Sequence, residues 1–331
     1  MSLLKNWLSA FTGFYKPNSE ISKLDPVSKW LFSARSVILI ISFQAGVIAS
    51  ILSYMAHSFN LAYSILLVLG LVCAHAASNL MNDYFGFKNG HDTQESPRRN
   101  YTLHPIASGT MTARGVKLSV AALVTLGVVI AAFFTYLHGI TVMYFAAAGL
   151  LLMLLYDASP ITLKSVGLGE IASFFVWGPL MIGGGFYALT GTISTNAFLI
   201  SIPYGLGVMS ILVGKHIDQM QFDKSKEQTT LPILLGTTNA RLFNAAAIAA
   251  MYVLVPIYVY YGVLPVFALL IALNLPKGAA AIEVFSKPKP TEPPAGYVGW
   301  PLWYHRYSLV NNRNFGWYYI LGLCLGILLL A

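Results

Sequence analysis

The feature that most constrains this chain is a series of nine apolar runs, each about as long as a membrane-spanning helix. A helix needs roughly 20 mostly apolar residues to cross a ~30 Å hydrocarbon core. Only 10% of the 331 residues are charged, against about 25% in soluble domains. We therefore predict an all-α membrane protein, a bundle of about nine transmembrane helices. The runs centre on residues 36–55, 60–82, 115–137, 139–156, 167–189, 196–214, 241–261, 264–283 and 314–331.

The basic residues support this division independently of hydropathy. All 20 Lys and Arg residues fall before the first run or in and around alternate connections, and the opposite turns hold none. The positive-inside rule then places the N-terminus and the charged loops in the cytoplasm, and the C-terminus on the other side. We expect a multi-pass integral membrane protein, in a prokaryotic cell membrane, whose acidic residues gather on the same cytoplasmic face.

The first 30 residues differ from the rest of the chain. Leu4, Leu8 and Phe11 recur at helical spacing, which predicts an amphipathic helix lying in the membrane interface. A disordered leader is the alternative. We accordingly divide the chain into an interfacial segment, 1–30, and a single transmembrane domain, 31–331.

Composition also excludes several classes of protein. The net charge of +8 is spread among apolar spans, so it indicates attraction to membrane lipids and no nucleic acid partner. The two cysteines, Cys73 and Cys324, both lie inside apolar runs. Their spacing predicts neither a disulfide framework nor a zinc site.

A first polar loop closes the second apolar run. Asn79, Asn82 and Asp83 lie on one helical face. Polar groups at the end of an apolar helix are costly unless they are paired or hydrated, and they indicate function. Gly86 and Gly90 allow the helix to break, which would turn Asp92 back toward Asp83. An ordinary polar cap on the helix is the alternative.

A second polar loop follows the sixth run and again carries carboxylates. Asp223 and Glu227 share a helical face, whereas Asp218 and Asp223 diverge by about 140° on an ideal helix. Both aspartates could reach a common ion only if the helix unwinds between them.

Two acidic loops facing each other across a bundle predict a site for a hard cation. Mg²⁺ prefers one or two carboxylates together with phosphate oxygens and water. Basic residues around the acids would neutralise the remaining phosphate charge, and an apolar bundle beneath them could hold a hydrocarbon tail. Together these features describe a prenyl diphosphate. The basic residues are Lys88, Arg98, Arg99, Lys164 and Lys215.

Histidines near these loops are weaker candidates. His91, His104 and His216 could contact a substrate. His75 lies in the second run, and we expect it to be a hydrogen-bonded core residue.

These motifs together resemble the UbiA superfamily of intramembrane prenyltransferases, over about residues 30–331. The first loop is most similar to the 1,4-dihydroxy-2-naphthoate prenyltransferase subgroup. The matching segments are Asn82-Asp83-Tyr84 with Gly90-His91-Asp92, Tyr156 with Leu163-Lys164 and Gly167-Leu168-Gly169-Glu170, Trp177-Gly178-Pro179, and Asp218 to Asp223 followed by Thr230-Leu231-Pro232. Two positions depart from the family pattern, because Gly86 and Gln219 stand where the family usually has aspartates.

The resemblance implies a fold, a reaction and a set of site residues. Mg²⁺ would bind the diphosphate of a polyprenyl diphosphate, the allylic cation would form beside an aromatic face, and an aromatic quinone precursor or another hydrophobic acceptor would capture it. Asn82 and Tyr156 join the metal ligands as catalytic residues, and Asn79 and Tyr84 join the basic residues in binding substrate. The implied metal ligands are Asp83, Asp92, Asp218 and Asp223.

Other functions stay open from the sequence. A transporter could use carboxylates at the membrane edge for ion coupling, although the polar groups gather on one face only. A terpene cyclase or a catalytically weakened lipid-binding member of the superfamily would fit the two missing acids.

Overall fold

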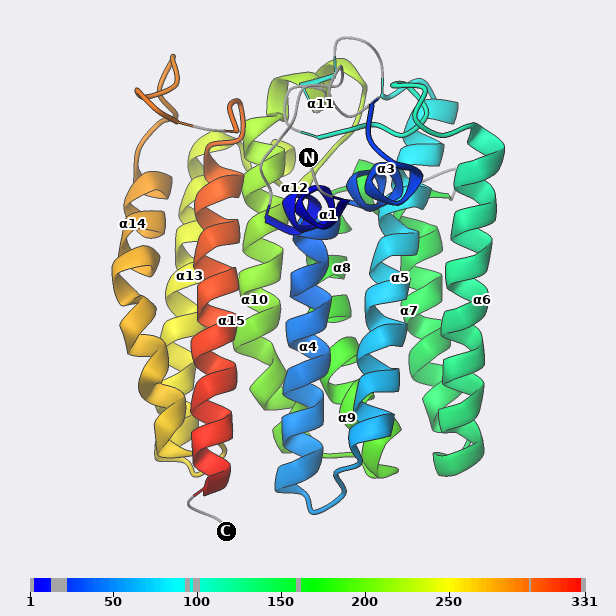
Figure 1. Ribbon diagram of the computed structural model, residues 1–331. Helices are drawn as coiled ribbons and strands as arrows, with labels where there is room; N and C mark the ends of the chain where they lie inside the picture. The colour runs from blue at the N-terminus through cyan, green and yellow to red at the C-terminus, as the bar shows by residue number, and fades with distance from the viewer. Residues whose placement is uncertain are drawn as a thin grey trace.

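The long helices of the protein run side by side in one bundle (Figure 1). The computed structural model describes residues 3–12, 23–92, 96–97, 102–158, 162–297 and 299–328. Within these ranges the only β pairing is an isolated parallel bridge between Val166 and Thr229. The predicted all-α class is therefore confirmed.

Nine helical segments correspond one by one to the nine apolar runs. Seven are long and apolar enough to cross a membrane; α7 is a shorter apolar helix, and α15 has the length but a more polar first half. The segments are α4 (Ser36–Met55), α5 (Leu61–Lys88), α6 (Ala113–His138), α7 (Thr141–Asp157), α8–η3–α9 (Gly169–Phe175, Val176–Gly184, Gly185–Thr190), α10 (Thr195–Asp218), α13 (Thr237–Tyr260), η4–α14 (Val266–Asn274, Leu275–Ser286) and α15 (Tyr304–Leu328).

The fifth segment has an irregularity that the sequence analysis did not anticipate. Its middle part, η3, is a π-helix that contains Pro179. Proline lacks a backbone N–H and clashes with the preceding turn, and a π-type widening is one way in which a helix accommodates such a break. The widened turn carries Trp177 into the wall of the cavity described below.

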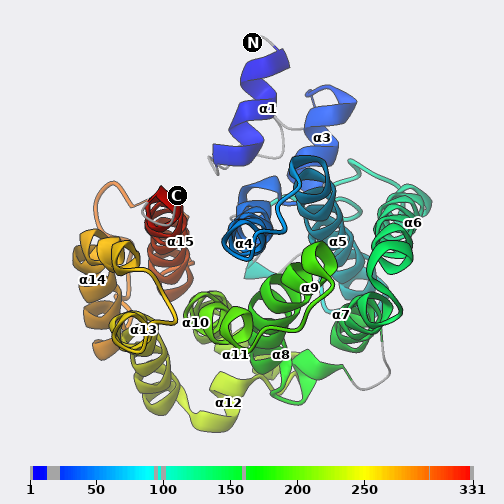
Figure 2. The ribbon, with the colours of Figure 1, turned by 90° about the horizontal axis from the view of Figure 1, so that it is seen from below.

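The four short helices gather at one end of the bundle (Figure 1). They are α1 (Leu3–Thr12), α3 (Pro26–Ser33), α11 (Met220–Ser225) and α12 (Leu231–Leu235). Both views show α1 lying across the axis of the bundle (Figures 1 and 2), and Leu4, Leu8 and Phe11 are exposed. This placement suits an interfacial helix, which stays a prediction. The C-terminal end of the chain lies at the opposite end of the bundle (Figure 1), as an odd number of spans requires.

One part of the charge assignment is corrected. Lys277 was placed in a connection at the charged end, but it lies in the middle of the segment Val266–Ser286, on its exposed side. A lysine can occupy such a position because its long aliphatic stem packs along apolar surface while the ammonium reaches toward the interface.

The bundle has two halves that differ in packing. Seen along its axis, it places α5, α6, α7 and α8–α9 on one side and α13, α14 and α15 on the other, with α4 and α10 between them (Figure 2). We call these the open half and the closed half. The largest buried cluster joins α4, α10 and the closed half and also includes residues of η3 and α9, whereas a smaller one lies at the far end of the open half, around Phe134 and Tyr187.

Candidate active site

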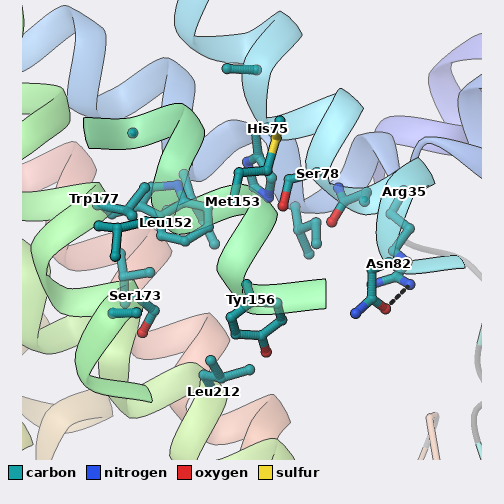
Figure 3. A pocket seen from close by; sticks show the side chains of 18 of the residues that line it. Arg35, His75, Ser78, Asn82, Leu152, Met153, Tyr156, Ser173, Trp177 and Leu212 are labelled. Carbon is teal, nitrogen blue, oxygen red and sulfur yellow. Dashed lines mark hydrogen bonds between the residues drawn. The ribbon is translucent and has the colours of Figure 1, made fainter. Parts of the chain in front are cut away.

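A cavity of about 830 Å³ runs through the open half. Its walls come from α4, α5, α6, α7, the α8–α9 segment and α10, with the start of α15. Polar residues line it at the charged end, and Figure 3 shows Arg35, Asn82 and Tyr156 there. Below them the lining is mostly apolar and reaches Phe134 and Val142, near the opposite end. From Tyr156 to Val142 on α7 the depth is about 21 Å, from the 1.5 Å rise per helical residue.

The first polar loop folds back on its own helix. α5 continues through Gly86 to Lys88, so Gly86 does not break the helix as expected. The chain turns at Gly90, which has a φ of +72°, a conformation open to glycine without a steric cost. The backbone N–H groups of His91 and Asp92 then donate to the Gly86 carbonyl at 2.9 and 3.0 Å. Asp92 thereby lies over Gly86, where an added Cβ would overlap its carboxylate.

Asp83 is not among the residues that line the cavity. It is fully buried and forms an ion pair with Arg35, whose backbone is left-handed at φ 56°. The Arg35 Nη2 also donates to Asn82 Oδ1 at 3.2 Å. Asn82 in turn donates to Asp157 at 2.6 Å, and Lys164 donates to the same oxygen at 2.7 Å. These bonds join α4, α5 and α7 at the cavity mouth and fix the orientation of Asn82.

The second polar loop separates its two aspartates. α10 ends at Asp218 and α11 begins at Met220, so the helix does break between them. Asp218 accepts the backbone N–H groups of Trp303 and His305 at 2.8 and 3.0 Å and lies 3.3 Å from Lys289. It therefore caps the start of α15, as carboxylates commonly do at helix N-termini, and does not line the cavity.

Asp223 is the acid of the second loop that does line the cavity. Its side chain is 5% exposed, and its Oδ2 has no hydrogen-bond partner among the residues the structure describes. Burial raises the pKa of this carboxyl above its ordinary value, although His216 and Lys215 beside it act in the opposite direction. A buried carboxylate oxygen without a partner is costly unless a ligand or ion completes it.

His216 and Glu170, which were not expected to interact, link the start of α8 to the end of α10. The Nδ1 of His216 lies 2.6 Å from Oε1 of the fully buried Glu170, and the same oxygen accepts the backbone N–H of Leu231 at 3.2 Å. The bridge between Val166 and Thr229 joins the same two connections. Sequence analysis gave no role to Glu170 beyond its motif, because nothing in the pattern indicated that it would meet His216.

The predicted site residues divide into three groups. Those that line the cavity are Asn79, Asn82, Asp92, Tyr156, Lys164, Lys215 and Asp223. Those that do not are Asp83, Tyr84, Lys88 and Asp218. Arg98 and Arg99 lie outside the described residues. The Tyr84 ring lies 5.8 Å from Lys117, and Lys88 lies 5.9 Å from the Phe85 ring, so each of these two predicted residues takes part in a cation–π contact.

Sequence analysis missed several residues that line the mouth. Lys226, Arg306 and Arg313 join Arg35 and Asp157 in the lining. The two arginines come from α15, more than 200 residues from the first loop, and were counted only as topology signals. An acid at the end of an apolar run was the one available indication for Asp157.

The acidic residues of the mouth fit a magnesium ion that is shared with a substrate. No group of three or more His, Cys, Asp or Glu side chains converges as a metal site in the part of the chain that the structure describes. Mg²⁺ bound with phosphate oxygens and water needs only one or two carboxylates. Asp92 and Asp223 supply one from each loop, and the unpartnered Oδ2 of Asp223 is available as a donor.

Comparison with known proteins gives the family of this fold and site. The profile of the UbiA prenyltransferase family matches residues 44–303, most of the chain. The chain belongs to the UbiA prenyltransferase family. It is therefore a prenyltransferase and an integral membrane protein of the UbiA fold, as the resemblance of its motifs implied.

The chain is similar in sequence to named members of this family. The chain is 26% identical over 250 residues to a 1,4-dihydroxy-2-naphthoate octaprenyltransferase of Bacillus subtilis, covering 74% of this chain and 78% of that protein. It is 25% identical over 273 residues to the UbiA prenyltransferase domain-containing protein 1 of Dictyostelium discoideum, covering 80% and 82%.

Solved structures share the fold at lower identity. A UbiA homologue from Aeropyrum pernix K1, in its apo form, superposes with a TM-score of 0.62 at 19% identity, covering 88% of this chain and 97% of that one. A UbiA homologue from Archaeoglobus fulgidus, bound to GPP and Mg²⁺, superposes with a TM-score of 0.61 at 15% identity, covering 90% and 99%.

Proposed function

We propose that this UbiA-family protein transfers the prenyl group of a polyprenyl diphosphate to an aromatic acceptor of the quinone-precursor type. One observation carries the proposal: a single cavity joins a charged mouth to an apolar shaft. A diphosphate needs a charged mouth, and a prenyl chain needs an apolar shaft. The name of the Bacillus subtilis relative supports an aromatic acceptor.

Several cations at the mouth suit the diphosphate. Lys164, Lys215, Lys226 and Arg306 line it, and their positive charge would stabilise the negative charge that develops on the leaving diphosphate. Asp92 and Asp223 would hold Mg²⁺, which supplies further charge stabilisation when bound. Asp83 and Asp218, which the motifs implied as ligands, would act instead by positioning Arg35 and α15.

The residues of the shaft would handle the reactive chain. Tyr156 lies at the junction of the mouth and the apolar part (Figure 3), where its ring face would stabilise an allylic cation. The apolar walls would exclude water from that cation, so that capture by an acceptor competes well with hydrolysis. Asn79 and Asn82 would orient the ligands at the mouth.

We also propose an orientation for the protein. The N-terminus and the charged end would face the cytoplasm, because every far-side turn lacks Lys and Arg and the positive-inside rule then applies. Residence in a prokaryotic cell membrane stays a prediction.

The test is a reconstituted reaction with product analysis. Purified protein receives Mg²⁺ and geranylgeranyl diphosphate with 1,4-dihydroxy-2-naphthoate or a panel of other aromatic acceptors, and products are followed by mass spectrometry. We expect a prenylated acceptor that disappears with EDTA. Diphosphate release with only a hydrocarbon or an alcohol would contradict acceptor transfer and favour a cyclase, for which the absent acids at Gly86 and Gln219 are the specific indication.

A further inference from the structure

A hydrogen-bonded triad lies in the cavity wall, below the charged mouth. Ser42 on α4, His75 on α5 and Trp177 in η3 come from three different segments. The Trp177 indole N–H donates to Ser42 Oγ at 2.9 Å, and Ser42 Oγ lies 2.9 Å from His75 Nδ1. The Trp177 and His75 rings also pack edge to face, with centroids 4.9 Å apart. The sequence analysis expected His75 to be a hydrogen-bonded core residue, and its Nδ1 meets that expectation.

Counting donors favours one tautomer of His75. Trp177 can only donate, so Ser42 Oγ accepts from it and keeps its own proton to give. Ser42 is fully buried, and this proton is satisfied when it is donated to Nδ1 of His75. The neutral imidazole then carries its proton on Nε2, since each nitrogen takes one role.

The other side of the His75 ring faces the cavity. His75 is 4% exposed and lines the cavity. Its Nε2 has no hydrogen-bond partner in the described ranges and is not fully enclosed by protein. The same lining includes Leu152, Met153 and the polar Ser78, which Figure 3 labels together with His75 and Trp177. An N–H that faces hydrocarbon alone is costly, so a ligand oxygen is the partner this wall is built to receive.

The depth of His75 indicates which ligand supplies that oxygen. Seven residues separate His75 from Asn82 on α5, which is about 10 Å along the helix. A prenyl chain has no oxygen at this depth, whereas an aromatic acceptor that reaches down from the mouth carries ring hydroxyl groups. We propose that His75 Nε2 donates a hydrogen bond to a ring hydroxyl of the acceptor, and that Ser42 and Trp177 are positioning residues that hold this tautomer. The inference rests on the proposed function for the acceptor class.

Direct binding tests this subsite without relying on turnover. Binding of 1,4-dihydroxy-2-naphthoate to the purified protein in nanodiscs is measured by calorimetry, for the wild type, His75→Phe and His75→Gln. Phe keeps the ring but removes the donor, and we expect affinity to fall about tenfold, the effect of losing one net hydrogen bond. Gln places an amide N–H close to the position of Nε2 and should recover most of the loss.

Acceptor analogues identify the contact itself. 1-Hydroxy-2-naphthoate and 4-hydroxy-2-naphthoate each lack one ring hydroxyl. In the wild type, one of these deletions should cost about tenfold in affinity. In His75→Phe the same deletion should cost almost nothing, because the two changes remove one shared interaction and are then not additive.

The outcomes separate this inference from the proposed function. Unchanged acceptor affinity in His75→Phe, additive losses, or a loss confined to geranylgeranyl diphosphate would each overturn the acceptor subsite while leaving prenyl transfer intact. Acceptor binding through His75 without any prenylated product would instead sustain the subsite and overturn the proposed transfer. Thermal unfolding of both variants shows whether a change reflects lost folding.

Discussion

The two halves of the bundle place their buried polar groups in different surroundings. In the closed half, the Tyr252 hydroxyl donates to Asn311 Oδ1 at 2.6 Å and Asn274 donates to Tyr252 at 2.8 Å. These bonds join α13, η4 and α15, although the buried Asn274 Oδ1 has no hydrogen-bond partner among the described residues. Around the cavity of the open half, Asp223 Oδ2 has no hydrogen-bond partner among the described residues, and His75 lines the wall. Polar groups paired inside the protein hold helices together, whereas groups left open to a cavity can bind a ligand.

The two halves also differ in whether their interior is hollow or filled. No residue of α13 or α14 lines the cavity, and the cluster of α4, α10 and the closed half fills the corresponding space with side chains such as Tyr204, Met251 and Phe315. The contrast shows that one helical bundle can hold a half filled by side chains beside a half that contains a cavity. Substitutions in the two halves should therefore affect different measurements.

The largest effect should come from the acid at the cavity mouth. Asp223→Asn keeps the size of the side chain but removes its charge, and we expect turnover to fall by at least about 100-fold. Thermal stability should change little, because the carboxylate has no partner at Oδ2 within the part of the chain that the structure describes. Prenyl transfer and the Mg²⁺ concentration at half-maximal rate are the measurements.

Asp218→Asn is the matched control for that variant. It removes the same charge five residues away, but from the cap of α15. It should lower stability by about 1 kcal/mol and leave the Mg²⁺ dependence unaltered. Equal loss of turnover in the two variants would contradict the separation of their roles.

A smaller effect on turnover should follow from moving a carboxylate from position 92 to position 86. Asp92→Ala should reduce turnover strongly, and Gly86→Asp alone should also reduce it, because the new Cβ overlaps the Asp92 carboxylate. The double variant Gly86→Asp with Asp92→Ala should be at least about tenfold more active than Asp92→Ala, since coupled neighbours are not additive. Steady-state rates of the three variants decide this. A double variant as inactive as Asp92→Ala would show that the two positions do not serve the same ligand.

The far end of the cavity should affect which prenyl chain is preferred. Phe134 is 1% exposed, lines the cavity, and packs edge to face on Tyr63 with centroids 6.1 Å apart. Phe134→Leu should raise the ratio of kcat/KM for a longer prenyl diphosphate over geranylgeranyl diphosphate by about tenfold, the usual effect of one apolar group in a pocket. An unchanged ratio would mean that the chain leaves between helices before it reaches Phe134.

The smallest effect on activity should come from the closed half. Tyr252→Phe removes the hydroxyl that joins Asn274 and Asn311, and we expect a loss of about 1 kcal/mol in stability. Turnover and both KM values should stay as in the wild type. Thermal unfolding and steady-state kinetics together check this, and a selective change in KM would show that the two halves are coupled.

The sequence predicted the elements of this fold closely but only part of the site. Apolar length and the placement of Lys and Arg identified all nine segments, because spanning a bilayer imposes both signals on each helix separately. The motifs also located Asn82, Asp92, Tyr156 and Asp223 at one cavity mouth. Lys277 was misplaced, since hydropathy alone does not tell a mid-helix lysine from one at a helix end.

The sequence by itself determined the class, the charged end of the bundle and the family of this protein, because these depend on composition and on local motifs. Tertiary structure decided what each polar residue does. Asp218 and Asp223 belong to one motif, yet one caps α15 and the other faces the cavity. His75 meets Ser42 and Trp177 only when α4, α5 and η3 pack together. Hydrogen bonds between distant segments leave no periodic trace in a sequence, so these roles follow from the packing alone.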